Sequence, residues 1–460
     1  MRNRPFLPDM DWKAFFNRQI DQIRQGGAVA LVWKLRQAGK FFRDYLLCLL
    51  FVPLVLLIRM LRPWLLVRWG GLINSRIGHF AANTELYLCE RDAGLNNPGQ
   101  RYVDVFYLLS SNCNEQLAVM WKRVLHIAPS WLLSPVSKAN RLLPGGVCHN
   151  VGSNAQHDRD IHNLLDRFPA HLEFTPAEEE RGRDGLLKMG IPPDASFVCL
   201  IVRDSAYLEE LESRDWSYQN YRDSNIQNYV PAVEKLAERG YFVIRMGSRV
   251  RDAMNSTHRR CIDYAFNGMR NDFMDIYLGA KCSFCVSTGT GFDAVPLIFR
   301  RPIAYVNMVP LGYLFTFRTG FLGITKHHRL ATDHRELTLR EIFSLGVGFC
   351  QETAAYTAKG VILEENSPEE ILDLVTEMDE RLRGCWQSSA DDEELQRRFW
   401  EIYPTDAVDV HQGRPLHGEI RARFGSKFLR KNPAWLQRTA MPLTGTTKDE
   451  NIRIVVDIFK

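Results

Sequence analysis

The sequence has little net charge, few cysteines and no long apolar run, and each shortage excludes a class of protein. Its 460 residues hold 58 Lys and Arg against 54 Asp and Glu, a net charge of +4. A folded body without a basic excess is not expected to bind nucleic acid. The ten cysteines lie scattered in apolar stretches, which predicts reduced core residues rather than a disulfide framework. No internal repeat or low-complexity stretch occurs.

The composition that remains is that of a globular protein with sizeable cores. Hydrophobic residues make up 45% of the chain and charged residues 24%, which argues against disordered and collagen-like classes. At roughly 150 residues per domain, the length corresponds to about three domain equivalents. A single small binding module is therefore excluded.

The longest apolar run, residues 45–58, is too short to cross a bilayer as a helix, which takes roughly 20 residues. Pro53 interrupts it, and an extension to Val67 takes in Arg59 and Arg62, which are costly in lipid unless they reach the headgroups. The residues that precede the run exclude a signal peptide. The run therefore indicates a segment that dips into a membrane or lies on it, more than one that spans it.

The charge of the chain is divided unevenly along its length. Residues 1–75 hold 12 Lys and Arg against 4 Asp and Glu, a net charge of +8, whereas the rest holds 46 against 50, a net charge of −4. The residues upstream of the apolar run also follow a basic amphipathic pattern, which is typical of helices in a membrane interface. We expect residues 1–75 to bind membrane lipids. The alternative is a hydrophobic helical hairpin packed on the protein itself.

The remaining chain alternates short apolar runs with amphipathic stretches. In the first half, strands are predicted at 85–90, 101–109 and 144–152, and helices at 114–127 and 160–168. A helix between Thr175 and Gly190 is expected to bridge two lobes. In the second half, strands at 197–202, 241–246, 282–286 and 303–307 alternate with helices at 228–240, 271–281 and 292–299. Alternation of this kind predicts an α/β protein with a parallel sheet covered on both faces.

Ligands bind such sheets at the carboxyl ends of the strands, where three segments carry suitable residues. The loop after the strand at 282–286 is Ser287, Thr288, Gly289, Thr290 and Gly291. Its glycines allow close approach of an anion, its hydroxyls can donate to it, and the following helix would add its dipole. No Lys follows the second glycine, so the loop is not a P-loop.

Two other predicted strands end in cations. Arg203 and Asp204 follow one buried strand, and Arg245 ends the next. A guanidinium suits a diphosphate because it forks onto two oxygens. Lys326, in a later loop, could reach the same group, although a solvated loop is the competing interpretation. Together these segments predict a site for a nucleotide diphosphate.

Several longer motifs carry a resemblance to a known family. They are HNVGSNAQHDRDIHNLL, FTPAEEERGRDGLLKMGI, VRDSAYLEE, STGTGFDAVPLIFRRPIAYVN and GEIRARFGSKFLRKNPAWL. With these motifs, residues 85–435 resemble a bacterial surface-polysaccharide glycosyltransferase family found in O-antigen and capsule clusters. The second half is also distantly similar to the nucleotide-sugar domains of fucosyltransferase-like enzymes and heptosyltransferases. The resemblance implies a GT-B fold, in which two Rossmann-like parallel-sheet lobes face a cleft.

A transferase of this type needs a base that takes the proton of the acceptor hydroxyl, and it works without a metal. Candidates for the base are His157 and Asp158, with His149 nearby. The competing interpretation is that Asp158 or Asp160 caps the helix that follows. Asp204, Asp223 and Ser224 are candidate contacts to the sugar or nucleotide, and capping of the helix at 228–240 competes for the last two.

The sequence thus predicts a metal-independent glycosyltransferase without a cofactor. Its donor would be a nucleotide diphosphate sugar, and its acceptor a lipid-linked or surface glycan at the cytoplasmic face of the inner membrane, where the enzyme would be peripheral or monotopic. The expected domains are a membrane-associating segment (1–75), an acceptor lobe (76–170), a nucleotide-sugar lobe (171–405) and a tail (406–460). The alternatives are a non-catalytic scaffold of a polysaccharide assembly complex and a transferase of a non-sugar group onto the same glycans.

Overall fold

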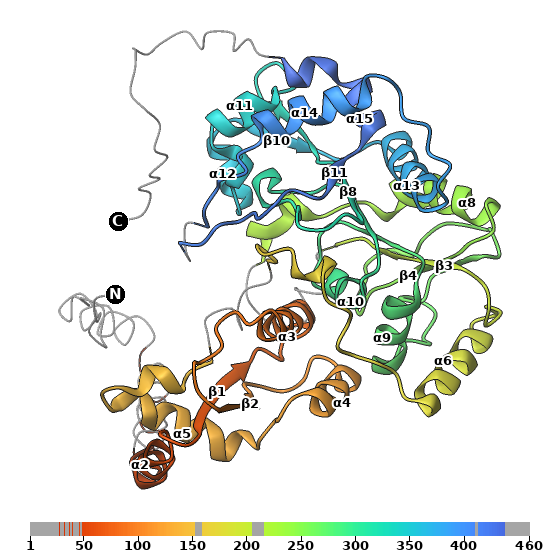
Figure 1. Ribbon diagram of the computed structural model, residues 1–460. Helices are drawn as coiled ribbons and strands as arrows, with labels where there is room; N and C mark the ends of the chain where they lie inside the picture. Colours follow the sequence, from red (N-terminus) through yellow and green to blue (C-terminus); the bar gives the residue numbers. More distant parts are fainter. Residues whose placement is uncertain are drawn as a thin grey trace, which may run out of the picture. The chain divides into compact units, whose positions relative to one another are not determined.

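The computed structural model describes residues 48–151, 159–204, 216–409 and 413–437, together with a few single residues between 27 and 46 (Figure 1). His157, Asp158 and almost all of the basic amphipathic stretch predicted before residue 45 lie outside these ranges. Within the described residues, no helix is both long enough and apolar enough to cross a membrane.

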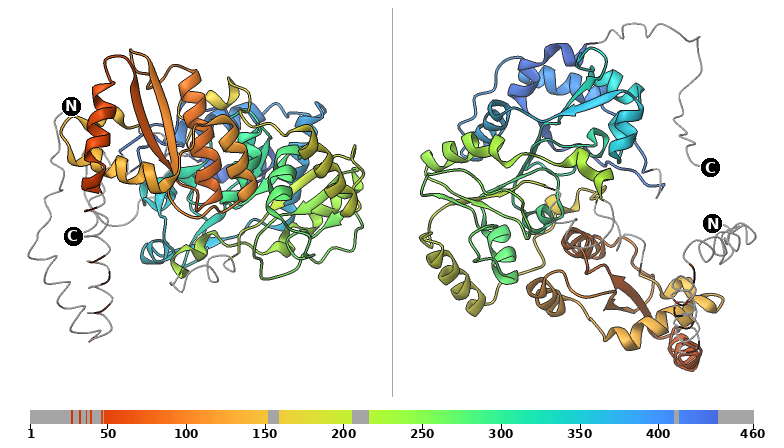
Figure 2. Two further views of the ribbon diagram at one scale, coloured as in Figure 1. Left: turned by 90° about the horizontal axis from the view of Figure 1, so that it is seen from below. Right: turned by 180° about the vertical axis from the view of Figure 1, so that it is seen from behind.

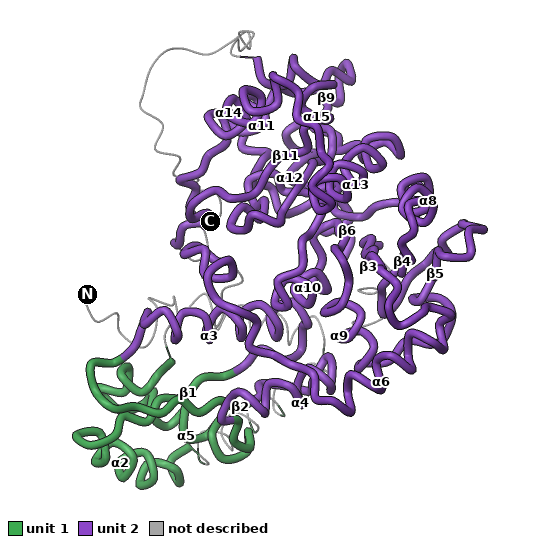
Figure 3. The backbone as a smooth tube through the Cα atoms, turned by 45° about the vertical axis from the view of Figure 1, so that its right-hand side comes forward, with its two compact units in different colours: residues 1–71, 98–107, 127–151 green, residues 72–97, 108–126, 152–460 purple. Residues whose placement is uncertain are grey.

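By packing, the chain divides into two units (Figure 3). Unit 1 comprises residues 1–71, 98–107 and 127–151, and unit 2 comprises residues 72–97, 108–126 and 152–460. Each unit therefore gathers segments that are separate in the sequence. The domain boundaries at 75, 170 and 405 stay predictions.

Unit 2 is built on a seven-stranded sheet in the order β11, β8, β7, β6, β3, β4, β5. All neighbouring pairs are parallel, which confirms the predicted mixed α/β class with a large parallel sheet. One of its interior strands, β3, is buried at every residue, as expected for a strand covered on both faces. The strands are β3 (Phe197–Ile201), β4 (Phe242–Arg245), β5 (Cys261–Ile262), β6 (Cys285–Ser287), β7 (Ile303–Tyr305), β8 (Phe321–Gly323) and β11 (Arg423–Phe424).

Helices cover both faces of this sheet, as Figures 1 and 2 show. On one face, α8 (Val230–Glu238) and α13 (Pro368–Leu382) pack on each other and on strands of the sheet. On the other, α9 (Asp272–Lys281) packs on α10 (Ala294–Ile298), α6 (Pro176–Lys188) and α4 (Glu115–Val124). Helix α6 begins with a capping box between Thr175 and Glu178, which satisfies amides that the first turn leaves open.

Short elements complete unit 2 beyond β8. An antiparallel pair joins β9 (His327–Leu330) to β10 (Val361–Glu364). The helices are α11 (Leu339–Ser344), α12 (Thr353–Ala358), α14 (Asp392–Ile402) and α15 (Ser426–Lys431). The ring of Phe399 in α14 stacks on that of Phe424 in β11, with centroids 4.3 Å apart. This aromatic contact holds α14 against β11, an edge strand of the sheet.

Unit 1 contains most of a two-stranded sheet of β1 (Leu66–Leu72) and β2 (Tyr102–Leu108), whose last residues pass into unit 2. Two helices pack beside each other in this unit, α2 (Val52–Met60) and α5 (Ser130–Leu142). Their shared core includes Val55, Trp69 and Val136. A 3₁₀ turn, η2 (Gly146–His149), follows α5.

Two strands predicted in the first half are wrong. Residues 85–90 lie in helix α3 (Thr84–Asp92), in which every residue from Thr84 to Glu90 is buried. A helix buried all round shows no polar face, so its pattern cannot be told from that of a buried strand. The segment 144–152 contains η2, preceded by Gly145 in the left-handed conformation. The end of the second segment still reaches the sheet, because Asn150 forms a parallel bridge with Trp69 of β1, and Ile127 forms another with Phe106 of β2.

The predicted elements of the second half are confirmed, with shorter ends. Cys282 and Cys285 are fully buried, as predicted for core residues. Cys285 lies in β6, whereas Cys282 directly follows α9. The segment 292–299 differs most, because it forms a three-residue 3₁₀ turn followed by the five-residue α10. A helix this short supplies no substantial dipole at its start. The predicted contribution of this helix to an anion site is therefore not supported.

Candidate functional site

Cationic side chains meet at the carboxyl ends of adjacent strands of unit 2. Arg203 lies just beyond β3, the loop 287–291 follows β6, and Lys326 lies between β8 and β9. The order β8, β7, β6, β3 brings these strand ends to one edge of the sheet. The loops are joined directly, because the amide of Arg203 donates to Thr288 Oγ1 at 3.0 Å.

Arg203 is held beside Asp223 without fully engaging it. Its Nε lies 3.3 Å from Asp223 Oδ1, yet neither atom has a hydrogen bond to the described residues. Its Nη2 donates to Gln219 Oε1 at 3.1 Å. Burial, followed by the charge of Arg222, lowers the pKa of Arg203 to about 10. An anion bound at this point would offset both the burial of the Arg203 charge and its repulsion by Arg222.

Lys326 approaches the same aspartate from another side. The side chain is nearly buried, and its ammonium donates to the backbone oxygen of Asp223 at 2.6 Å. That is one bond of the three that an ammonium can donate. Burial lowers the pKa of Lys326, and the charges of Glu365 and Asp223 oppose that fall. Burial also raises the pKa of Asp223, although Arg203 and Lys326 favour its ionised form.

Arg222 completes the site and was missed by the sequence reasoning. It ends the 3₁₀ helix η5 (Ser217–Arg222), and its Nη2 donates to the backbone oxygen of Gly289. No predicted strand ends there, so the argument from strand ends did not select it, although its neighbours Asp223 and Ser224 were candidates. We call Arg203, Arg222 and Lys326 the cation cluster.

The hydroxyl groups of the loop 287–291 differ in their hydrogen bonding. Ser287 is buried and donates to Asp293 Oδ2 at 2.9 Å, while it accepts the amide of Gly289. Its hydroxyl is thus used within the loop. By contrast, Thr290 Oγ1 has no hydrogen-bond partner among the described residues, although little of the atom reaches the surface.

One glycine of the loop is required by its backbone conformation, and the other lies close to a distant segment of the chain. Gly289 has φ +73°, and a Cβ there would lie 2.7 Å from Met308 Sδ. Gly291 meets Gly78 backbone to backbone, since a Cβ on Gly78 would lie 3.1 Å from the Gly291 Cα. The segment before α3 therefore supports the loop from behind.

Two of the predicted donor contacts lie in other environments. Arg245 is fully buried, and its Nη1 bonds the Asp263 carboxylate at 3.1 Å and the oxygen of Asp252. Asp204 accepts the amide of Arg251 at 3.0 Å. These bonds hold the loop after β4. The predicted contacts of Arg245 and Asp204 with a donor have no support in this geometry and stay untested.

Ser224 lies closer to the cation cluster. Its amide donates to the oxygen of Arg203 at 3.0 Å, and its hydroxyl accepts from Asn307 Nδ2 at 3.2 Å. The side chain thus positions the turn next to Arg203. Capping of the first turn of the following helix falls instead to Asn225, whose side chain accepts the Gln227 amide.

Of the candidates for the catalytic base, His157 and Asp158 lie outside the described residues, and only His149 can be described. His149 is buried in unit 1, where its ring stacks on Trp69 and its Nδ1 lies 2.7 Å from the oxygen of Val67. Burial lowers its pKa, and its contacts are those of a packing residue. Asp160 accepts the amides of Leu164 and Leu165 at the start of the 3₁₀ turn η4 (Leu164–Asp166). The helix predicted at 160–168, which Asp158 or Asp160 was expected to cap, is wrong, because only this short turn forms.

One group of described residues has the composition of a metal site, namely Glu85, Cys89 and His171. Arg300 already occupies its centre, because its Nη2 lies 2.5 Å from Glu85 Oε1 and 3.5 Å from Cys89 Sγ. His171 Nδ1 also bonds Glu85. The guanidinium takes the place that a cation would fill, so this cluster is an internal ion pair.

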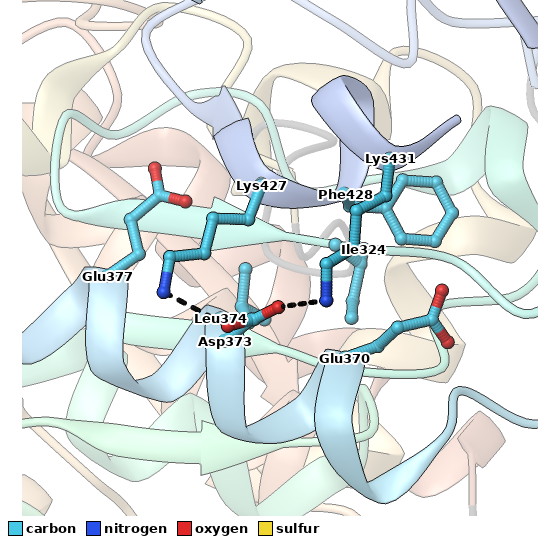
Figure 4. A pocket seen from close by; sticks show the side chains of 9 residues that line it. Ile324, Glu370, Asp373, Leu374, Glu377, Lys427, Phe428 and Lys431 are labelled. Carbon is cyan, nitrogen blue, oxygen red and sulfur yellow. Dashed lines mark hydrogen bonds and ion pairs between the residues drawn. The ribbon is translucent and has the colours of Figure 1, made fainter. Parts of the chain in front are cut away.

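Two cavities of unit 2 lie elsewhere. A cavity of about 10 Å³ between α13 and α15 holds at most one water, and Figure 4 shows Lys427 and Lys431 both reaching Asp373 beside it. A larger one, of about 590 Å³, lies before β7 and β8, at the opposite edge of the sheet from the cation cluster. It is lined by four arginines, three of which pair with carboxylates of the protein: Arg300 with Glu85, Arg318 with Asp166, and Arg421 with Glu419.

No family model matches the chain, and no curated protein matches it. Among solved structures, it is similar to the E. coli ADP-heptose lipopolysaccharide heptosyltransferase II, with 12% identity and a TM-score of 0.33 over 53% of this chain and 86% of that one. A family 9 glycosyltransferase from Veillonella parvula gives 9% identity and a TM-score of 0.31 over 52% and 80% of the two chains. At such identities and scores, the function has to be argued from the residues of the site.

Proposed function

We propose that this protein is a glycosyltransferase that takes a sugar from a nucleotide diphosphate sugar. The observation that carries the proposal is the cation cluster. At the carboxyl edge of the parallel sheet, Arg203 lies against the Asp223 carboxylate and Lys326 donates to the Asp223 backbone oxygen. Arg222, the neighbour of Asp223 in sequence, donates to the backbone oxygen of Gly289 in the adjacent loop. Cations that repel one another in a partly buried place are stabilised by a polyanion, and a diphosphate offers the bidentate oxygens that guanidinium groups prefer.

In the proposed reaction, an acceptor hydroxyl attacks the anomeric carbon and the bond from that carbon to the diphosphate oxygen breaks. The electron pair leaves with the diphosphate, where Arg203, Arg222 and Lys326 stabilise the growing negative charge. Thr290 Oγ1, which has no partner among the described residues, would donate to the same group. The hydroxyl proton passes to a base, for which His157 and Asp158 remain the candidates.

The finer parts of the proposal come from the sequence resemblance. They are a GT-B arrangement, catalysis without a metal, and a lipid-linked or surface-glycan acceptor in O-antigen or capsule synthesis. Residues 1–75 would hold the enzyme at the cytoplasmic face of the inner membrane, as a peripheral or monotopic protein.

The donor is tested with the full chain and a panel of nucleoside diphosphates and their sugar conjugates, first by thermal shift and then by calorimetry. We expect one nucleotide of the panel to raise the melting temperature. The double variant Arg203→Gln, Lys326→Met should weaken its binding by at least about tenfold, because each lost charged hydrogen bond is worth about 1.5–3 kcal/mol. Release of the diphosphate from the bound sugar nucleotide then separates an enzyme from a non-catalytic scaffold.

The matched control is Arg183→Gln, Lys188→Met, which removes the same charges from exposed positions of α6. It should bind the nucleotide as the unmodified chain does. If no nucleotide of the panel binds, or if the two double variants bind equally well, the assignment of the cation cluster is wrong.

A further inference from the structure

Large apolar side chains are exposed mainly in unit 1. The five most exposed ones of the described residues all belong to it: Leu50, Met60, Trp64, Trp131 and Val147, at 70–81% exposure. Soluble proteins rarely leave such side chains together in water, and contiguous patches of them mark binding surfaces.

The pattern is clearest along α2, which is apolar on both faces. Val55 points into the core of unit 1, and Val52 and Ile58 pack against that core. The opposite face continues through helical residues before Phe51 and through the turn after Met60. Most of its members are three or four residues apart, which places them in one row. This apolar stripe consists of Leu46, Leu49, Leu50, Leu56, Leu57, Met60, Leu61 and Trp64.

Polar groups of α2 do not interrupt the stripe. From the sequence, Arg59 was expected to reach lipid headgroups. In the structure, its side chain turns toward α5 instead. Its guanidinium donates to Asn140 Oδ1 at 2.7 Å and to the backbone oxygen of Pro144 at 2.7 Å. The guanidinium charge, which would be costly beside lipid, is therefore solvated by oxygens at the end of α5. The outer face of α2 stays apolar.

The charge of unit 1 identifies what covers the stripe. The unit holds 15 Lys and Arg against 5 Asp and Glu, a net charge of +10, whereas unit 2 holds 43 against 49, a net charge of −6. Within its described residues, the single acid is Asp104, which pairs with Arg68 at 2.6 Å. A second copy of this chain would bring two strongly positive units together, which is unfavourable. An anionic surface with an apolar interior matches both properties.

We propose that the apolar stripe of unit 1 inserts into the interface of an anionic lipid bilayer, with α2 lying along the surface. The inference rests on the membrane part of the proposed function and names the surface responsible. Trp64 suits such a position, because indole rings favour the boundary between headgroups and acyl chains. The basic residues of the unit would bind the headgroups.

The test is flotation of the full chain with vesicles made of equal parts phosphatidylglycerol and phosphatidylcholine. The unmodified protein should float with these vesicles and float less with phosphatidylcholine alone or in high salt. The double variant Leu57→Gln, Met60→Gln should lower the partition coefficient by at least about tenfold, since each side chain loses its burial in lipid. Its melting temperature should be unchanged, because neither side chain is buried in the protein.

The matched control is Leu187→Gln, Leu382→Gln, which changes two leucines of unit 2 with exposures of 55% and 44%. This variant should float as the unmodified chain does. Equal flotation of both double variants overturns the proposal, as does a concentration-dependent dimer in the absence of lipid that Leu57→Gln, Met60→Gln abolishes. Nucleotide binding is measured on the same variants, so a failed flotation is distinguished from a failed donor site.

Discussion

Units 1 and 2 use apolar residues in opposite ways. Unit 2 buries them within a parallel sheet and its helices, and it keeps a slight acidic excess. Unit 1 has a small core around Val55 and Trp69, exposes a row of large apolar side chains beside it, and carries the basic excess of the chain. The two units thus differ in where they place their most exposed apolar side chains and in the sign of their net charge.

Matched aromatic truncations should break or confirm this contrast most strongly. Phe399→Ala removes a fully buried ring that stacks on Phe424, and we expect it to lower the free energy of unfolding by about 3–5 kcal/mol. Trp64→Ala removes a larger ring that is 74% exposed, and the expected change is within about 0.5 kcal/mol. Urea denaturation of both variants measures the difference. A comparable loss for Trp64→Ala would mean that Trp64 packs inside the protein.

A second prediction concerns the buried charges of unit 2. His327 lies between Glu336 and Glu370, with nitrogen to oxygen distances of 2.6 and 3.0 Å. Burial lowers its pKa, but the hydrogen bonds and charges of the two glutamates outweigh that effect and raise it from 6.5 to about 10. The stabilisation is therefore fully present below pH 6.5 and is lost as the pH rises toward 10.

Between pH 7 and pH 9, unmodified protein should lose about 2 kcal/mol of stability through this residue, since each pKa unit corresponds to about 1.4 kcal/mol. His327→Gln should remove that slope, while His126→Gln, at an exposed position, should retain it. Denaturation midpoints at the two pH values test this. An unchanged slope in His327→Gln would assign the pH dependence to other groups.

The smallest expected effect compares two arginines of unit 1. Arg59→Met removes the bonds to Asn140 and Pro144 and should cost about 1–2 kcal/mol, seen as faster hydrogen exchange in α2 and α5. Arg62→Met, three residues later and exposed, should leave that exchange unchanged. If both variants exchange alike, Arg59 does not hold α2 on α5.

The sequence predicted the second half of the chain well because its strands and helices alternate in clear periods. β3, α8, β4 and α9 all lie where those periods place them. The failures have a shared physical cause. Helix α3 has no polar face, and the turn at Gly145 depends on a left-handed backbone, so neither shows a readable period.

The candidate site was predictable where it follows strands and not elsewhere. Arg203, Thr288 and Lys326 come near the ends of strands that lie together in the sheet, whereas Arg222 reaches the site from a 3₁₀ helix. The extent of unit 1 was also hidden. Residues 98–107 and 127–151 join it only through the pairing of β1 with β2 and the packing of α5 on α2.

The contact between Gly78 and Gly291 has a genetic consequence. The two residues are more than two hundred positions apart, yet a methyl group on Gly78 would press on the backbone of Gly291 at 3.1 Å, and backbone cannot swing aside as a side chain can. In a saturation-mutagenesis screen scored for nucleotide affinity, Gly78 should therefore group with the loop that it supports and not with its own neighbours. Non-additive effects on affinity of substitutions at Gly78 and Gly291 would show that the two segments act together, although they lie far apart in the sequence.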